Sequence, residues 1–286
     1  MTTWQALFIG LLQGATELFP VSSLGHAVVL PSLLHWPFDQ ASPTFLPFLV
    51  LLHLGTATAL LIIYRHEWLR IAVGFVRAAT RGRVDGPDER LAMLLALGTL
   101  PGGALGLFLV QPLARLFATP RVAAVMLIVN GAILLGTEVL RRRSERSGVS
   151  REEQEHDFKD VSQISVGAVA VVGLVQSLAL VPGISRSGIT MAGGLVAGLR
   201  HQEAVKFAFL LATPIIAGAG VLEVPVLLQQ RLAASTLLLY VVAAVLAGAA
   251  AYVSARFLVR YFRSGRLDPY GWYCAALGVV SLVLLR

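Results

Sequence analysis

The 286-residue chain has 56% hydrophobic and 14% charged residues, a net charge of +7 and a mean hydropathy of +0.75. Apolar runs recur along its whole length, which excludes a soluble globular protein. The basic residues lie between these runs without interleaved aromatic residues, which excludes a nucleic-acid-binding module. We therefore expect an all-α polytopic membrane protein with a single integral membrane domain over residues 1–286.

The first element in chain order, residues 4–36, is apolar, but Pro20 and the region of Gly25 break it in the middle. Six uninterrupted apolar stretches have about the 20 residues that are needed to cross ~30 Å of hydrocarbon. These predicted transmembrane helices lie at 45–64, 91–110, 121–140, 203–223, 236–259 and 270–285. Between the third and the fourth lies a second broken stretch, 161–200, interrupted by Pro182, Gly183 and Gly188.

Basic residues orient these elements, because cytoplasmic loops of membrane proteins are enriched in Arg and Lys. Three connections are strongly basic and are expected in the cytoplasm: 65–90, 141–160 and 256–266. The 161–200 stretch would then begin and end on the cytoplasmic side, although it is too short for two complete spans. This favours a re-entrant helix-loop-helix hairpin. The same counting makes 4–36 a second re-entrant hairpin that enters from outside.

The two predicted hairpins also resemble each other. Shifted by 163 positions, QGATELFPVSSLG lies over QSLALVPGISRSG, which matches Gln13 with Gln176 and Ser22 with Ser185. The pattern predicts an inverted-topology repeat whose broken tips meet near the membrane midplane. Repeat one would cover about 1–140, the cytoplasmic loop 141–160, and repeat two about 161–286.

The tip of the first hairpin carries four residues with chemical potential: Glu17, Ser22, Ser23 and His26. An ionisable side chain at this depth is a functional candidate, because burying it is costly. Gln13 lies one turn before Glu17 on the same helical face. It is either a functional group or a side chain that stabilises helix packing through an interhelical hydrogen bond. Alternatively, Glu17 is only a structural partner of Arg186, His26 is a packing histidine and the serines are helix caps.

The tip of the second hairpin, PGISRSG, carries Arg186, which needs an anion at the same depth. Ser185 and Ser187 flank its guanidinium on a glycine-rich turn, a pattern typical of an oxyanion cradle. The start of the following helix would present free N–H groups to a phosphate. Together, the tips provide a carboxylate, a hydroxyl nucleophile, an imidazole and an anion clamp, which indicates phosphoryl transfer.

The stretches QGATELFPVSSLGH and LVPGISRSGITMAGGLVAGL closely resemble the two signatures of the undecaprenyl-diphosphatase family, the bacitracin-resistance phosphatases of the bacterial inner membrane. The resemblance covers nearly the whole chain and includes LLHLGTATALLIIYR and FAFLLATPIIAGAG. It implies an enzyme that removes the terminal phosphate of a C55 polyprenyl diphosphate, so that the lipid carrier of wall precursors is reused. It also implies a divalent cation, Mg²⁺ or Ca²⁺, and a site that opens to the periplasm.

The resemblance assigns roles to single positions. Glu17 is expected to hold the metal, with Gln13 at the first place of the same motif. Ser23 is expected as nucleophile and His26 as proton relay. The expected phosphate-binding residues are Ser22, Ser185, Arg186, Ser187 and Gly188. Many family members have Glu in place of Gln13 and Thr in place of Leu24, so this chain lacks a second anionic metal ligand and a third hydroxyl.

Two alternatives to this mechanism are direct attack by His26 and attack by metal-activated water. A rival of another class is a polyprenyl-phosphate transporter or flippase, because broken helices in an inverted repeat are also a transporter architecture. A transporter, however, does not need a serine and a histidine beside its Arg and Glu. The expected partners are the polyprenyl diphosphate lipid and the membrane, and a homodimer is left open.

Overall fold

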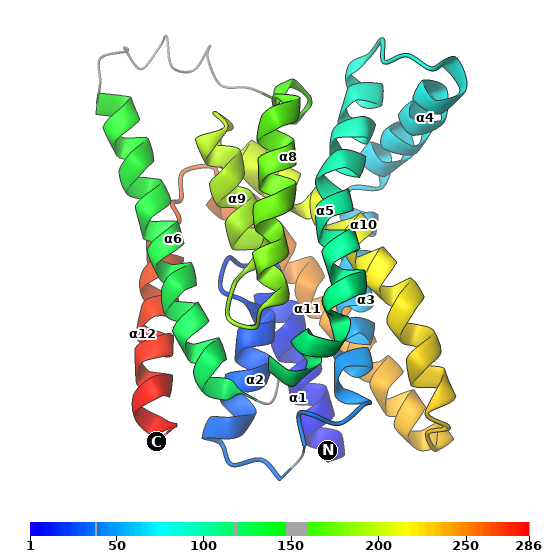
Figure 1. The fold of residues 1–286 in the computed structure, drawn as a ribbon, viewed down its shortest axis with the longest axis vertical. Helices are drawn as coiled ribbons and strands as arrows, with labels where there is room; N and C mark the ends of the chain where they lie inside the picture. The colour runs from blue at the N-terminus through cyan, green and yellow to red at the C-terminus, as the bar shows by residue number, and fades with distance from the viewer. Residues whose placement is uncertain (38, 117–118, 147–159, 286) are drawn as a thin grey trace.

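The structure is a computed structural model that describes residues 1–37, 39–116, 119–146 and 160–285 (Figure 1). Over these ranges the chain is all-helical and contains no β-strand. This confirms the predicted helical class. Most of the predicted loop 141–160 lies outside the described residues.

Two pairs of short helices come from opposite ends of the molecule (Figure 1). The first pair consists of α1 (Thr3–Thr16) and α2 (Ser23–Leu33). The second consists of α8 (Val166–Val175), the 3-10 helix η2 (Gln176–Leu180) and α9 (Arg186–Val196). Their connecting segments, here called the first tip (17–22) and the second tip (181–185), touch near the middle of the molecule. The pairs fall on the two broken stretches predicted at 4–36 and 161–200.

The longer helices surround these pairs. They are α3 (Phe45–Ile63), α5 (Pro87–Leu116), α6 (Pro120–Arg146), α10 (His201–Gln229), α11 (Ala234–Tyr261) and α12 (Asp268–Leu284). Among the described residues, five helices are long and apolar enough to cross a membrane, and they coincide with the first five predicted spans. The sixth predicted span, 270–285, falls on α12, which has 17 residues and a length of about 25 Å.

The connection 65–90 is not simply a loop, as the sequence prediction had it. It contains a further helix, α4 (Arg65–Arg81), which ends at Gly82 with φ of 64°. Apolar residues recur at helical spacing along α4 between the arginines, so the segment forms an amphipathic helix in spite of its charge. A short 3-10 turn, η1 (Val161–Gln163), precedes α8.

Close packing of α11 against α1 and α3 positions the centre of the molecule. A Cβ added to Gly14 of α1 would lie 2.0 Å from the carbonyl oxygen of Ala247, and one added to Gly55 of α3 would lie 2.0 Å from that of Ala244. Small residues therefore let the three backbones touch, as in other membrane helix bundles. The end of α1 is thereby held beside the middle of α3.

The predicted repeat has a structural counterpart. The bounds of α9 are those of α2 moved by 163 positions. Ser22 and Ser185 are the two N-caps, and each hydroxyl oxygen accepts a hydrogen bond of 3.1 Å from the backbone N–H of a glycine, Gly25 or Gly188. Equivalent serines thus begin equivalent half-helices, because a cap satisfies N–H groups that the helix itself leaves unpaired.

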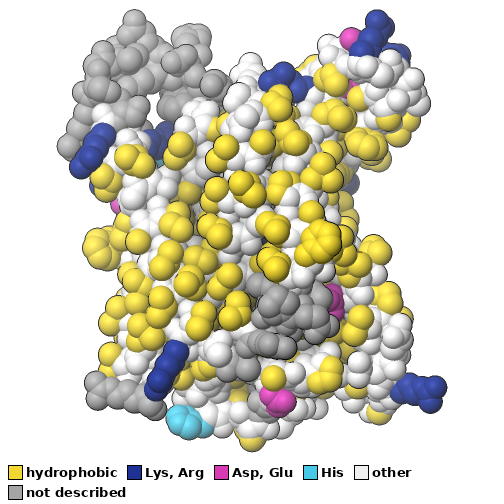
Figure 2. All heavy atoms as spheres, viewed as in Figure 1, with side chains coloured by type: hydrophobic (Ala, Val, Ile, Leu, Met, Phe, Trp, Pro, Cys, Tyr) yellow, Lys and Arg dark blue, Asp and Glu magenta, His cyan; other side chains and the backbone are white. Residues whose placement is uncertain are grey.

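The surface is that of a multi-pass membrane protein. Hydrophobic side chains are spread over the middle of the visible face, while Arg and Lys gather mainly toward its two ends (Figure 2). Large apolar side chains such as Phe108 and Val221 are 82% and 75% exposed. Such exposure is unfavourable in water and is expected where the solvent is hydrocarbon.

Candidate active site

Glu17 stands at the centre of a buried polar cluster at the end of α1, where it is the C-cap residue. It is 7% exposed. The side-chain amide of Gln13 donates to Glu17 Oε2 over 2.9 Å, and the hydroxyl of Ser23 donates to the same oxygen over 2.5 Å. Gln13 and Glu17, which were predicted to lie one turn apart, therefore contact each other directly. The turn of the first tip brings Ser23 back to Glu17.

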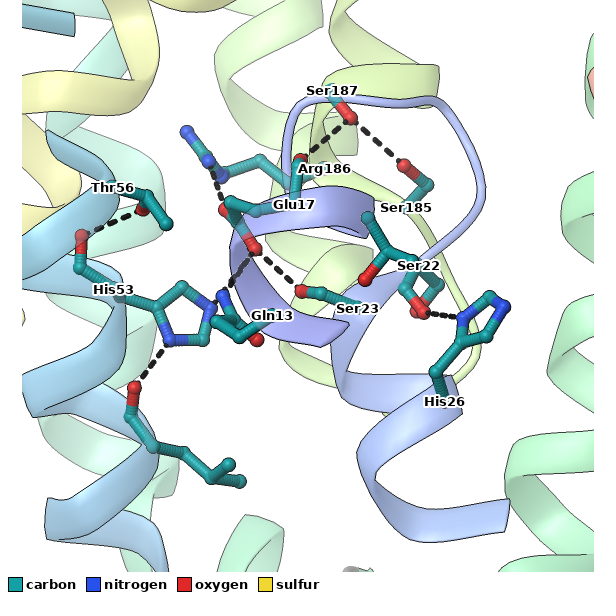
Figure 3. A network of polar contacts seen from close by, with 12 residues as sticks. Gln13, Glu17, Ser22, Ser23, His26, His53, Thr56, Ser185, Arg186 and Ser187 are labelled. Atoms are coloured by element: carbon teal, nitrogen blue, oxygen red, sulfur yellow. Dashed lines mark hydrogen bonds and ion pairs between the residues drawn. The ribbon is translucent and has the colours of Figure 1, made fainter. Parts of the chain in front are cut away.

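Two basic side chains from other elements also meet Glu17 (Figure 3). Arg186, at the start of α9, donates from Nη2 to Glu17 Oε1 over 2.5 Å. His53, in the middle of α3, places Nε2 3.1 Å from Glu17 Oε2. A buried carboxylate is stable only when it is paired and hydrogen-bonded, and both of its oxygens are. The first tip, the second helix pair and α3 therefore converge on one charge.

The two tips are tied together through their backbones. Ser22 has φ of 66°, a conformation that costs a non-glycine residue about 1–3 kcal/mol and that clusters at functional sites. Its hydroxyl oxygen accepts the N–H of Gly183 in the second tip over 3.2 Å. Asn130 of α6 completes the connection: it accepts from the N–H of Ser185 and donates to the carbonyl oxygen of Pro20, over 2.9 Å each.

Ser185 and Ser187 also contact the first tip. The hydroxyl of Ser187 donates to the carbonyl oxygen of Phe19 over 2.9 Å, and the two hydroxyls lie 3.0 Å apart. Gly188 lies close to the first tip as well, because an added Cβ would be 3.3 Å from Cβ of Pro20. The predicted phosphate-binding residues are therefore gathered at the contact between the tips, where their hydroxyls now bind protein groups.

His26 lies on α2 and points away from Glu17 (Figure 3). Its Nδ1 is 2.7 Å from the carbonyl oxygen of Ser22, and its Nε2 is 2.8 Å from the hydroxyl of Tyr273 on α12. The His26 and Tyr273 rings are stacked with centroids 5.7 Å apart. Both ring nitrogens are thus engaged away from Ser23, and the proton relay through His26 stays a prediction.

Sequence reasoning missed His53, Asn130 and Tyr273. His53 and Asn130 lie inside the predicted spans 45–64 and 121–140, and polar side chains within a membrane span are functional candidates by default. That signal was available, although it does not indicate which partner each residue meets. Tyr273 is near the end of a span, where tyrosine is common, so its sequence position carries no comparable signal.

The residues present can accommodate a divalent cation. Gln13 is buried, and its Oε1 has no hydrogen-bond partner among the described residues. No group of three or more His, Cys, Asp or Glu side chains suited to a metal occurs in the described part of the chain. Glu17, the amide oxygen and oxygens from a bound phosphate would together offer oxygen donors of the kind that Mg²⁺ accepts.

Comparisons with known proteins agree with this site. The sequence model of a family described as "Bacitracin resistance protein BacA" matches residues 6–280. A protein of Acidiphilium cryptum named undecaprenyl-diphosphatase is 48% identical, over 100% of this chain and 99% of its own length. A protein of the same name from Granulibacter bethesdensis is 45% identical over 100% of this chain and 98% of its own length. Undecaprenyl-diphosphatase 2 of Chromobacterium violaceum is 41% identical over 99% of both chains.

Proposed function

This chain belongs to the bacitracin resistance protein BacA family, and we propose that it hydrolyses undecaprenyl diphosphate to undecaprenyl phosphate and inorganic phosphate. The reaction returns the lipid carrier to cell-wall synthesis and gives resistance to bacitracin. One observation carries the proposal for the site. The buried carboxylate of Glu17 accepts a hydrogen bond from the hydroxyl of Ser23 on one oxygen and from the guanidinium of Arg186 on the other.

This geometry supports nucleophilic catalysis by Ser23. Its Oγ would attack the terminal phosphorus while its proton passes to Glu17 Oε2, 2.5 Å away, and the bond from that phosphorus to the bridging oxygen would break. Water would then hydrolyse the phosphoserine. Arg186 would move from Glu17 Oε1 onto the phosphate oxygens, where a guanidinium can bind two at once.

The phosphate would bind where the two tips meet. The hydroxyls of Ser22, Ser185 and Ser187 and the N–H groups around Gly188 lie there, so a phosphate would exchange protein contacts for its own. Direct attack by His26 is disfavoured, because both of its nitrogens are engaged on the α12 side of α2. Attack by water is the other alternative. A Mg²⁺ or Ca²⁺ ion on Glu17 and the Gln13 amide oxygen would neutralise charge on the diphosphate.

For the membrane arrangement, we propose six spans and two re-entrant hairpins in the bacterial inner membrane. The short pairs α1–α2 and α8–α9 come from opposite ends and touch at their tips, as an inverted repeat requires (Figure 1). The site would open to the periplasm, on the side of the turn between α2 and α3. A homodimer, the assembly considered from the sequence, stays a prediction that light scattering of the detergent complex would check.

Phosphate release in detergent tests this function, because transport is impossible there. Purified protein with undecaprenyl diphosphate should release phosphate, and Ser23→Ala should lose it by 10²-fold or more, on the scale of a lost catalytic group. Ser177→Ala is the matched control, since that hydroxyl donates only to the carbonyl oxygen of Gly173 in the preceding helix, α8. No release by the wild type would favour the transporter, and full activity of Ser23→Ala would refute the assigned nucleophile.

A further inference from the structure

The surroundings of His53 require a positive charge beside Glu17. His53 Nδ1 lies 2.7 Å from the carbonyl oxygen of Leu49, which can only accept, so Nδ1 carries the hydrogen. Nε2 lies 3.1 Å from Oε2 of Glu17, which as a carboxylate oxygen also only accepts. A neutral imidazole would therefore place its lone pair against a carboxylate. Either a second proton or a metal ion must stand between them.

His201 shows that a buried His–Glu pair does not by itself need this extra charge. Its Nδ1 is 2.9 Å from a guanidinium nitrogen of Arg141, which donates, and its Nε2 is 2.7 Å from Oε1 of Glu138, to which it donates. Each nitrogen thus has a complementary partner in the neutral ring. His53 differs because both of its nitrogens face acceptors.

A third acceptor is available in the same place. Gln13 is 1% exposed, its Nε2 donates to Glu17 Oε2, and its Oε1 has no partner. The two ends of a side-chain amide have nearly the same shape, so a half-turn of the amide places Oε1 where Nε2 lies. An amide oxygen, an imidazole nitrogen and a carboxylate oxygen would then face a common point.

We infer that His53, through Nε2, is a further ligand of the divalent ion proposed on Glu17 and Gln13, and that this nitrogen raises the affinity of the site for transition-metal ions relative to Ca²⁺. The inference rests on the proposed function, because oxygens of the bound diphosphate complete the coordination. Imidazole favours transition metals, whereas Ca²⁺ selects oxygen ligands. The assignment adds His53 to Glu17 as a second protein ligand, which the sequence motif around Glu17 did not indicate.

The local geometry agrees with this assignment. Two neighbouring ligands of an octahedral ion with bonds of about 2.1 Å lie about 3 Å apart, close to the 3.1 Å between His53 Nε2 and Glu17 Oε2. The hydrogen bond from Nδ1 to the Leu49 carbonyl is the support that metal-binding histidines commonly have, because it fixes the tautomer and the ring plane. Arg186 contacts the other oxygen of Glu17, Oε1, so its guanidinium does not itself occupy the Oε2 side.

Electron spin echo spectroscopy of bound Mn²⁺ tests the ligand directly. Purified protein in detergent receives Mn²⁺ with methylenediphosphonate, a diphosphate analogue that resists hydrolysis. The spectrum should show nitrogen coupling from an imidazole, and histidine labelled with ¹⁵N should change its pattern. His53→Gln should lose the coupling and bind Mn²⁺ more weakly, on the order of 10–100-fold, while its affinity for Ca²⁺ changes less. The matched control, His201→Gln, should keep both properties.

The labelled wild type keeps the test informative even when His53→Gln does not fold. Bound Mn²⁺ without histidine coupling, or coupling that persists in folded His53→Gln, would overturn the inference and assign the positive charge to a proton. Phosphate release with Mg²⁺ is measured on the same preparations. Release by a wild type that lacks the coupling would refute only the metal ligand, whereas the absence of any release would refute the proposed function.

Discussion

Asn130 should control activity without touching the substrate, because it joins the two tips through their backbones. It is fully buried, and its amide pairs with the N–H of Ser185 and with the carbonyl oxygen of Pro20. Asn130→Leu keeps a similar volume but removes these two hydrogen bonds and a weaker one of 3.3 Å to Cys274 Sγ. The N–H of Ser185 is then left unpaired inside the molecule, and the carbonyl oxygen of Pro20 keeps only the 3.8 Å contact from the Cys274 thiol.

The expected magnitude follows from these two contacts. Interhelical hydrogen bonds in membrane proteins contribute about 0.6 kcal/mol on average and up to about 1.7 kcal/mol, so the pair accounts for roughly 1–3 kcal/mol. If this energy holds Ser23 and Arg186 together at Glu17, kcat should fall roughly 10- to 100-fold, since 1.4 kcal/mol corresponds to a factor of ten. The unfolding midpoint of the detergent complex should fall as well.

Phosphate release and thermal unfolding of purified Asn130→Leu are the measurements. Thr137→Val is the matched control in the same helix, because the hydroxyl of Thr137 donates only to the carbonyl oxygen of Ile133 over 2.8 Å. It should behave like the wild type in both assays. An Asn130→Leu protein with the kcat and the unfolding midpoint of the wild type would refute the reasoning, since the tips would then be held without this amide.

Three further predictions test the site and the topology. Arg186→Lys keeps the charge but not the two-point grip, so kcat should fall roughly 10²-fold with a smaller change in KM; near-normal kcat in the detergent assay would exclude a catalytic role. Glu17→Gln should abolish phosphate release while the protein still elutes as a folded species, because Ser23 loses its base; ordinary activity would reduce Glu17 to a structural partner of Arg186. In a Cys274→Ala background, an impermeant maleimide should label Ala41→Cys from the periplasm but neither Arg83→Cys nor Gln202→Cys, and periplasmic labelling of the last would contradict the inverted repeat.

The sequence by itself determined the features that depend on local composition. Hydrocarbon accepts only backbones whose hydrogen bonds are satisfied within the segment, so the long apolar runs had to be helices. Pro20 and Pro182 lie at the two interruptions, where the missing proline N–H disfavours a continuous helix, although Pro214 and Pro225 are accommodated within α10. Ser22 and Ser185 begin the half-helices because a serine hydroxyl caps N–H groups that the helix leaves unpaired, and this explains how a weak sequence repeat could indicate equivalent caps.

Tertiary structure decided which of these polar groups meet. Glu17 could be recognised as costly to bury, but that His53 of α3 and Arg186 of α9 would share its two oxygens follows from how the helices pack. His26 was expected beside the nucleophile, yet its ring faces Tyr273, 247 positions away in the chain. Pairings of this kind depend on the close approach of helices distant in sequence. Helix propensity and hydropathy act over a few residues and therefore carry no information about them.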